Sequence, residues 1–193
     1  MTRRITLHLG DITTDRRADA IVNAANTSLQ AGGGVCGAIH RAAGPALETE
    51  CRMLAGCPTG DATRTGAGRL SARYVIHAVG PIWRGGHEGE PRLLASCYQR
   101  AIALAEASAC AYVALPAIST GIYGYPLGPA ADVALRATWF ALDRHPGVIE
   151  ARFWLFDEAT RDLFADTLAR LEAAITAGVA LDADPAVPIP DPS

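Results

Sequence analysis

The chain has 193 residues, of which half are hydrophobic and 19% are charged, and its formal net charge is −3. This composition is typical of one globular domain with a sizeable core and excludes a largely disordered chain. All 17 basic residues are arginine, which excludes the chemistry of a Walker-A, Schiff-base or covalent lysine.

Short apolar segments alternate along the chain with longer amphipathic ones, which predicts strands and helices in turn. We expect strands at 5–9, 20–22, 62–65, 74–79, 112–115 and 152–156. We expect helices at 36–43, 45–54, 93–109, 129–143 and 158–177. Strands that alternate with helices of this length indicate βαβ units, so the predicted fold class is α/β, with a mostly parallel sheet covered by helices on both faces.

The segment 178–193 differs in composition from the rest of the chain. It holds four of the twelve prolines together with several aspartates. We therefore predict one domain over residues 1–177 and a disordered tail over residues 178–193.

Charge, cysteine content and apolar runs bear on partners and location. The chain has no basic block, so no nucleic-acid partner is expected. Its five cysteines are scattered without a Cys-x-x-Cys pair, which predicts reduced thiols rather than a zinc site or a disulfide framework. Neither a signal-peptide core nor a run of about 18 apolar residues is present. We expect a cytoplasmic protein with no membrane partner, and a compact domain of this kind is compatible with a monomer.

Polar and glycine-rich segments follow the predicted strands at the points where the strands end. They are residues 10–12, 23–26, 32–35, 119–124 and 156–158. The carboxyl ends of parallel strands meet at one edge of a sheet, where open α/β folds bind their ligands. We therefore expect these five segments to converge on one crevice.

Two of these segments, 32–34 and 119–124, are glycine-rich loops that can face each other. Glycine lets backbone N–H groups approach an anion closely, and the start of a helix adds partial positive charge. Together the two loops predict a diphosphate site that needs no lysine.

Gly32, Gly34 and Gly37 also match the spacing of the dinucleotide fingerprint. In that fingerprint the first glycine follows its strand directly, whereas residues 27–31 intervene here. The nearest candidates for its acidic residue, Glu48 and Glu50, fall in a predicted helix. A nicotinamide dehydrogenase is therefore not expected.

Longer motifs follow one another in a recognisable order. They are Gly-Asp-Ile-Thr from residue 10, Asp-Ala-Ile-Val-Asn-Ala-Ala-Asn from 19, Gly-Gly-Gly-Val-x-Gly-Ala-Ile-His-Arg-Ala-Ala-Gly from 32, Cys-Pro-Thr-Gly from 57, Val-Ile-His-Ala-Val-Gly-Pro from 75 and Pro-Ala-Ile-Ser-Thr-Gly-Ile-Tyr-Gly-Tyr-Pro from 116. This order, over residues 5–171, resembles the macrodomain family, and within it the MacroD-type branch of ADP-ribose and O-acetyl-ADP-ribose hydrolases. The resemblance implies a three-layer α-β-α fold with a central mixed, mostly parallel sheet. It also implies ADP-ribose and mono-ADP-ribosylated proteins as partners, and no cofactor.

The resemblance further implies a role for each matching residue. Asp11, with the Ile12 backbone beside it, would accept a hydrogen bond from the adenine amino group, and Phe156 would stack near the adenine. Asn26 would hold the distal ribose, with Tyr123 packed beside it. The main chain would enclose the diphosphate from two sides, at Gly33, Gly34 and Val35 and at Ser119, Thr120, Gly121 and Ile122.

One position departs from the MacroD-type pattern. The x of Gly-Gly-Gly-Val-x-Gly is an aspartate in that branch, where it orients or activates the attacking water, and here it is Cys36. A thiol carries no fixed charge and is a weak hydrogen-bonding group. Losing a general base typically forfeits about 10² to 10⁴ in rate. Cys36, Asn26 and Tyr123 are the candidate catalytic residues.

Three interpretations of Cys36 stay open. In the first, which we favour, a diphosphate oxygen held by the two loops orients the water at the anomeric carbon. The protein then hydrolyses the ester link to mono-ADP-ribosylated Glu or Asp side chains, or O-acetyl-ADP-ribose. In the second, the protein is a non-hydrolytic reader of ADP-ribose. In the third, Cys36 itself acts as a thiolate favoured by the helix start.

The remaining polar residues of interest receive structural interpretations. His77 lies in a hydrophobic strand and is expected to be a hydrogen-bonded core histidine, and His40 is assigned no chemistry. Asn23 is expected to satisfy backbone groups at a strand end, and Asp157 to begin a helix together with Glu158. No group of His, Cys, Asp and Glu has ligand spacing along the sequence, so no metal is expected.

Overall fold

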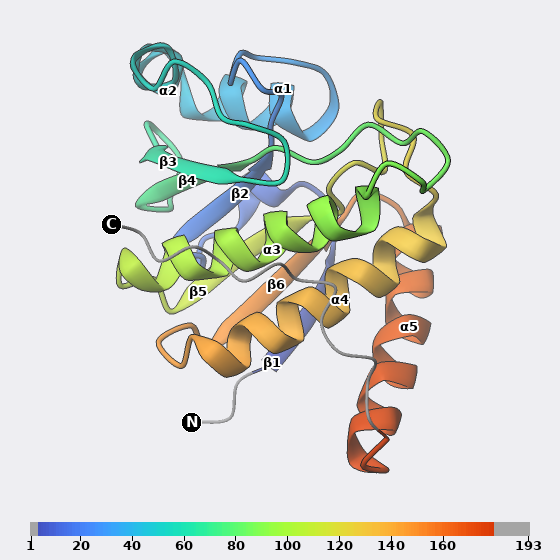
Figure 1. Cartoon of the computed structure of the whole chain (residues 1–193). Coiled ribbons are helices and arrows are strands. Elements are labelled where there is room, and N and C mark those ends of the chain that lie inside the picture. The colour runs from blue at the N-terminus through green and yellow to red at the C-terminus, as the bar shows by residue number, and fades with distance from the viewer. Residues whose placement is uncertain (1–3, 180–193) are drawn as a thin grey trace.

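Every strand and helix expected from the sequence forms within residues 4–179, the part of the chain that the computed structural model describes (Figure 1). The strands are β1 (Arg4–Leu9), β2 (Ala20–Ala24), β3 (Ala62–Gly66), β4 (Tyr74–Ala78), β5 (Tyr112–Pro116) and β6 (Glu150–Leu155). The helices are α1 (Gly34–Ala43), α2 (Pro45–Met53), α3 (Glu90–Ala107), α4 (Leu127–Arg144) and α5 (Glu158–Thr176), with a short 3-10 helix, η1 (Ile12–Thr14), that was not expected. Helix α3 begins three residues earlier than expected, because Pro91 suits the first turn of a helix.

The six strands of the described chain form one sheet in the order β1-β6-β5-β2-β4-β3. All neighbouring strands are parallel except β3, which pairs antiparallel with β4 at the sheet edge. The expectation of a mixed, mostly parallel sheet is therefore confirmed. The carboxyl ends of β1, β2, β5 and β6 consequently lie along one edge, which is where the polar and glycine-rich segments begin.

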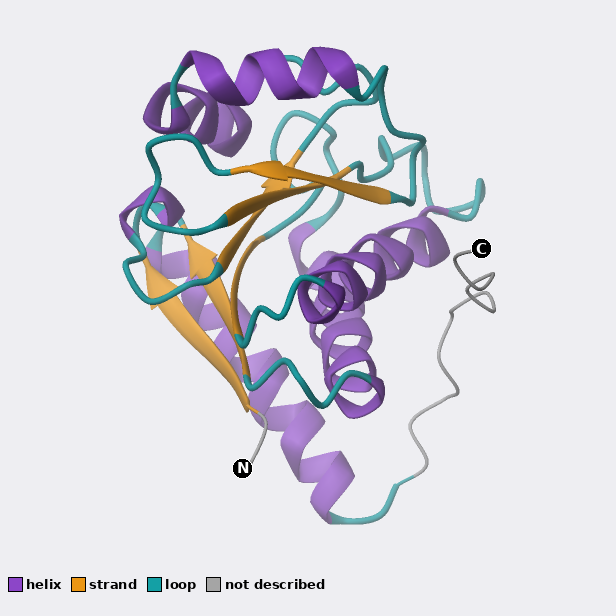
Figure 2. Cartoon of the chain, turned by 90° about the vertical axis from the view of Figure 1, so that its left-hand side faces the viewer, coloured by secondary structure: helices purple, strands orange, loops and turns teal. Residues whose placement is uncertain are grey.

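Helices cover both faces of the sheet, so the molecule has three layers (Figure 2). Helices α1 and α2 pack on one face, and α3, α4 and α5 pack on the other. Alternate residues of a strand point to opposite faces, and in β2 the fully buried Ile21 faces α1 and α2 while Val22 faces α3 and α4. Because the central strands are buried on both sides, their sequences are almost continuously apolar.

The predicted tail, 178–193, lies outside the described residues except for Gly178 and Val179, and the boundary at residue 177 stays a prediction. Helix α5 ends at Thr176, with Ala177 as its C-cap. Among residues 4–179, no helix combines the length and the apolar character that crossing a membrane requires.

Candidate functional site

Two adjoining cavities open at the carboxyl edge of the sheet. The smaller, of about 210 Å³, is lined by parts of the segments 24–36 and 117–123 together with Gly80. The larger, of about 600 Å³, is lined by residues 10–12, by α1 and by the segment 154–157, among others. Both cavities touch Gly34, Val35, Ala117 and Gly121, so they form one cleft with a waist between the two glycine-rich loops. The cleft brings together all five segments that were expected to converge.

The first side of the waist is the start of helix α1. Its N-cap residue is Gly33, which has no side chain to satisfy the first amides of the helix. Gly34 has a φ of 57°, in the left-handed region that favours glycine. Because the first N–H groups of a helix point away from its body, this turn presents main-chain donors and partial positive charge to the waist.

The second side is the loop that follows β5. Hydrogen bonds within the loop hold its shape: the Gly124 amide donates to the Gly121 carbonyl at 2.9 Å, and the Tyr125 amide donates to the Ser119 carbonyl at 3.0 Å. Ser119 has a φ of 67°, which is unusual for a residue with a side chain. Its hydroxyl is buried and has no partner among the described residues, although Ser119 lines the smaller cavity. Strained backbone of this kind is concentrated at functional sites.

Tyr98 of α3 holds the start of the second loop by hydrogen bonds, a role that was not predicted from the sequence. Its hydroxyl donates to the Pro116 carbonyl at 3.0 Å and accepts from the Ile118 amide at 2.9 Å. The side chain is 1% exposed. One buried hydroxyl therefore ties the end of β5 to the start of the loop.

The two loops also approach each other directly. A Cβ atom on Gly33 would lie 2.9 Å from Cδ1 of Ile122. Ile122 itself is 83% exposed, so its side chain reaches across the waist rather than into the core. The narrowness of the waist thus depends on the absence of a side chain at position 33.

Comparison with known proteins assigns this arrangement to a family. The model of the macro domain matches residues 22–134, more than half of the chain. The chain belongs to the macro domain family. The resemblance inferred from the ordered motifs is thereby confirmed.

Relatives and solved structures extend the match over most of this macro domain. An O-acetyl-ADP-ribose deacetylase of Salmonella typhimurium is 49% identical over 172 residues, which cover 87% of this chain and 96% of the relative. The Oceanobacillus iheyensis macrodomain solved with ADP matches with a TM-score of 0.82 at 36% identity, covering 89% of this chain and 93% of that one. The Trypanosoma brucei macrodomain solved with ADP-ribose matches with a TM-score of 0.78 at 41% identity, covering 84% of this chain and 68% of that one. The expected three-layer macrodomain fold is confirmed.

The residues predicted for adenine binding line the larger cavity of the macro domain. Asp11 is exposed and caps η1, where its Oδ1 accepts from the amide and the hydroxyl of Thr13 at 2.9 and 2.8 Å. Ile12 is buried behind it, and Phe156 stands at the rim, 88% exposed. An exposed phenylalanine at the rim of a cavity is available to stack on a planar ligand.

Asn26 and Tyr123, predicted for the distal ribose, line the smaller cavity. The Asn26 side chain also orders its own loop: its Oδ1 accepts from the Ser28 hydroxyl at 2.8 Å and from the Gln30 amide at 3.1 Å, and its Nδ2 donates to the Gln30 carbonyl at 2.8 Å. Asn26 therefore shapes the smaller cavity in addition to facing it.

Cys36 lies in the first turn of α1 and lines the smaller cavity, although only 5% of it is exposed. Its sulfur donates to the Gln30 carbonyl at 3.7 Å and accepts from Asn23 Nδ2 at 3.6 Å. None of the described residues that line this cavity is Asp, Glu or His. Within the described part of the chain, the lining of this cavity therefore offers no carboxylate or imidazole base to a ligand.

Behind Cys36 lies a buried hydrogen-bond network that differs from the one expected for Asn23. The Asn23 amide does not satisfy backbone groups; its Nδ2 lies 3.2 Å from His77 Nδ1, and its Oδ1 has no partner among the described residues. His77 is fully buried and also bonds Thr65 Oγ1 at 2.9 Å. The expectation of a hydrogen-bonded core histidine at position 77 is therefore confirmed, and burial lowers the pKa of this ring to about 4.

Two further residues of the cleft were not singled out from the sequence. Arg41 and Trp154 both line the larger cavity. The signal for Arg41 was helical spacing, since Gly34, Ala38 and Arg41 share one face of α1 and all three line this cavity. Trp154 carried no such signal, because its role at the cleft depends on where β6 lies in the sheet.

The expected helix start at Asp157 is confirmed, and the spacing argument against a metal-ligand group needs correction. The Asp157 carboxylate accepts from the Thr160 amide at 2.8 Å and caps α5. Residues that are far apart in the sequence nevertheless form a group of ligand type: His40, Cys51 and His77 place their ligand atoms within 4.8 Å of one another. Spacing along the chain could not show this group because its members come from three different elements.

Proposed function

We propose that this macro domain binds ADP-ribose in the cleft and hydrolyses ester-linked ADP-ribose. The substrates are mono-ADP-ribosylated Glu or Asp side chains and O-acetyl-ADP-ribose. Support comes from the shape of the cleft, from the solved macrodomains with ADP and ADP-ribose, and from the relative named as an O-acetyl-ADP-ribose deacetylase. The proposed boundary of the catalytic domain is residue 177.

The two cavities match the two ends of the proposed ligand. The adenosine occupies the larger cavity, with Asp11 and the Ile12 backbone at the adenine edge and Phe156 on its face. The diphosphate occupies the waist, where amides of Gly34 and of Gly121 lie on opposite sides. The distal ribose occupies the smaller cavity beside Asn26 and Tyr123, the proposed catalytic pair that positions it.

The proposed mechanism rests on one observation, the lack of a carboxylate or imidazole among the described residues that line the smaller cavity. In the proposed mechanism the base therefore comes from the ligand. A diphosphate oxygen fixed at the waist accepts a proton from water, and the oxygen of that water bonds to the anomeric carbon. For the protein-linked substrate, the bond from this carbon to the ester oxygen breaks, and the Glu or Asp carboxylate leaves with the electron pair. Holding the water and the diphosphate in fixed positions can lower the activation barrier by several kcal/mol.

The same observation favours a second candidate, a non-hydrolytic reader of ADP-ribose. Binding needs only the two loops and the adenine contacts, all of which are present without a base. Catalysis by Cys36 itself has less support, because its S–H is directed at the Gln30 carbonyl and its sulfur is almost wholly buried. Small buried cysteines of this kind generally act as packing residues.

Release of ADP-ribose from a glutamate-ADP-ribosylated protein separates these possibilities. We expect turnover by the wild type and a rate within about 3-fold of it for Cys36→Ala, because the sulfur takes no part. Cys36→Asp is expected to raise the rate by about 10², the lower part of the range for a general base. Binding of ADP-ribose without any turnover would establish the reader, and loss of turnover in Cys36→Ala alone would make the thiol catalytic.

A pair of glycine variants tests whether the waist holds the diphosphate. Gly34→Ala forces alanine into the left-handed region, at a φ of 57°, and puts a methyl group at the waist. Gly178→Ala imposes nearly the same strain, at a φ of 65°, away from the cleft. We expect both variants to lose about 1–2 kcal/mol of stability, and only Gly34→Ala to weaken ADP-ribose binding. Equal affinities in calorimetry would remove the waist from the proposal.

A further inference from the structure

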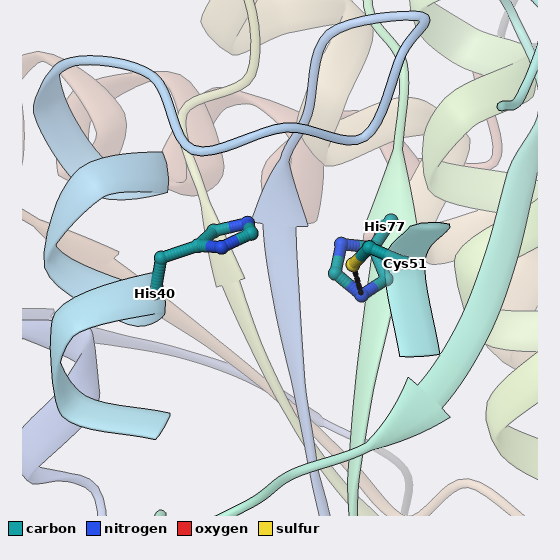
Figure 3. Close-up of side chains that lie close together, drawn as sticks. All are labelled: His40, Cys51 and His77. Carbon is teal, nitrogen blue, oxygen red and sulfur yellow. Dashed lines mark hydrogen bonds between the residues drawn. The ribbon is translucent and has the colours of Figure 1, made fainter. Parts of the chain in front are cut away.

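His40, Cys51 and His77 form a buried cluster on the face of the sheet that α1 and α2 cover (Figure 3). His40 comes from α1, Cys51 from α2 and His77 from β4. Their exposed fractions are 8%, 3% and 0%. None of the three lines either cavity of the cleft, so the cluster is separate from the proposed ADP-ribose site.

We propose that this cluster binds one divalent cation of the zinc class, with His40, Cys51 and His77 as protein ligands. Imidazole nitrogen and thiolate sulfur are the donors that zinc prefers, and three protein ligands leave one tetrahedral position for water. The distance from Cys51 Sγ to His77 Nε2 is 3.7 Å. Zinc–sulfur and zinc–nitrogen bonds of ordinary length at the tetrahedral angle separate these two atoms by about 3.6 Å. This edge of the site is therefore already formed.

His40 supplies a second, independent observation that points to a ligand at the cluster. Its Nε2 is buried and has no hydrogen-bond partner among the described residues. Figure 3 shows the His40 ring extending from α1 toward His77 and Cys51. All ligand atoms of the cluster lie within 4.8 Å of one another. A side-chain rotation that moves the His40 nitrogen by about 1 Å therefore brings it to coordination distance.

Neighbouring groups let His77 present a lone pair to the ion. The Asn23 amide oxygen has no partner among the described residues, and its nitrogen lies 3.2 Å from His77 Nδ1. Rotation of that amide lets the oxygen accept from Nδ1–H, which leaves Nε2 unprotonated. A carbonyl bonded to the second nitrogen is a usual partner of a metal-bound histidine. When no ion is bound, Nε2 can instead donate to Thr65 Oγ1 at 2.9 Å, so the ring has a partner in both states.

A third cavity, of about 480 Å³, gives the cluster a route to solvent. Cys51 lines it, together with the segment 28–31, Glu48, Arg52 and Ala55. On binding, the sulfur–hydrogen bond breaks, the sulfur–metal bond forms and the proton leaves to water, as thiol ligation requires. In the same cavity wall the Glu48 carboxylate pairs with Arg52 at 2.8 Å, so the wall carries both signs of charge.

Titration of the chelator-treated full-length chain with Co²⁺ alone tests the site. We expect one ion per chain and a thiolate-to-cobalt charge-transfer band that Zn²⁺ abolishes by displacement. Cys51→Ser is expected to remove the band. Both Cys51→Ser and His40→Gln are expected to weaken Zn²⁺ binding at least about 100-fold, which is more than the loss on removing a residue that only supports a metal ligand. Cys57→Ser is the matched control, because Cys57 is also buried, at 7% exposed, but lies outside the cluster.

Two results would overturn the proposal. One is a wild-type chain that takes up no Co²⁺ or shows no charge-transfer band. The other is a band and an affinity that His40→Gln leaves unchanged, a test that keeps all five cysteines and so stays valid if Cys51→Ser fails to fold. ADP-ribose binding, measured on the same samples, reports separately on the cleft, so failure of the metal site and failure of the proposed function are distinguishable.

Discussion

Replacing Phe156 by alanine tests adenine binding in the cleft without changing the stability of the fold. The side chain is 88% exposed, so its removal uncovers almost no core, and we expect the free energy of unfolding to change by less than about 0.5 kcal/mol. Stacking of a base on an aromatic ring is worth about 1–3 kcal/mol by alanine substitution. Because Phe156 stands at the rim and covers one face of the ligand only, we expect about 1.4 kcal/mol, a 10-fold rise in the Kd for ADP-ribose.

Isothermal titration calorimetry with three ligands locates the effect. Phe156→Ala is expected to weaken ADP-ribose and ADP equally and to leave ribose 5-phosphate unaffected, because only the first two carry adenine. Met53→Ala is the control: Met53 is 74% exposed on α2 and lines none of the cavities described above. An unchanged Kd for ADP, or an equal loss with ribose 5-phosphate, would refute the placement of adenine against Phe156.

Two further predictions concern the support of the cleft and the response of the fold to acid. Tyr98→Phe leaves two buried backbone groups of the second loop unpaired. We therefore expect the free energy of unfolding in urea to fall by about 2–4 kcal/mol and ADP-ribose binding to weaken. The control is Tyr125→Phe, which should change neither quantity because the buried Tyr125 hydroxyl has no partner among the described residues. Burial alone would raise the pKa of Asp15, but hydrogen bonds from Arg152 at 2.8 Å and from neighbouring groups hold that pKa below its ordinary value. The stabilisation by the ionised Asp15 is therefore fully present above a pH of about 4 and is lost as the pH falls through the lower folded-state pKa. Asp15→Asn should lower the free energy of unfolding by about 3 kcal/mol at neutral pH and make that free energy less dependent on pH in acid. An equal loss of stability at every pH would contradict this sign.

The elements and the edge of the sheet that carries the site were predictable because their signals are local. Apolar periodicity marks strands such as 74–79, and glycine or proline marks the ends of helices such as α1 and α2. Because the carboxyl ends of parallel strands share an edge of the sheet, segments such as 10–12 and 119–124 are predicted to meet there. The ordered motifs added the family, which the comparison confirmed over residues 22–134.

Local patterns along the chain therefore predict the order of the elements and the sheet edge of the site, and the resemblance to the MacroD-type branch marks Cys36 as the departure from an aspartate. Packing in three dimensions decided that no described residue lining the smaller cavity is Asp, Glu or His, that Tyr98 holds the second loop and that Asn23 bonds His77. It likewise decided that His40 and Cys51 meet His77 across two helices and a strand. These facts depend on contacts between residues far apart in the chain, and neither spacing nor periodicity carries the distances between side chains that packing alone establishes.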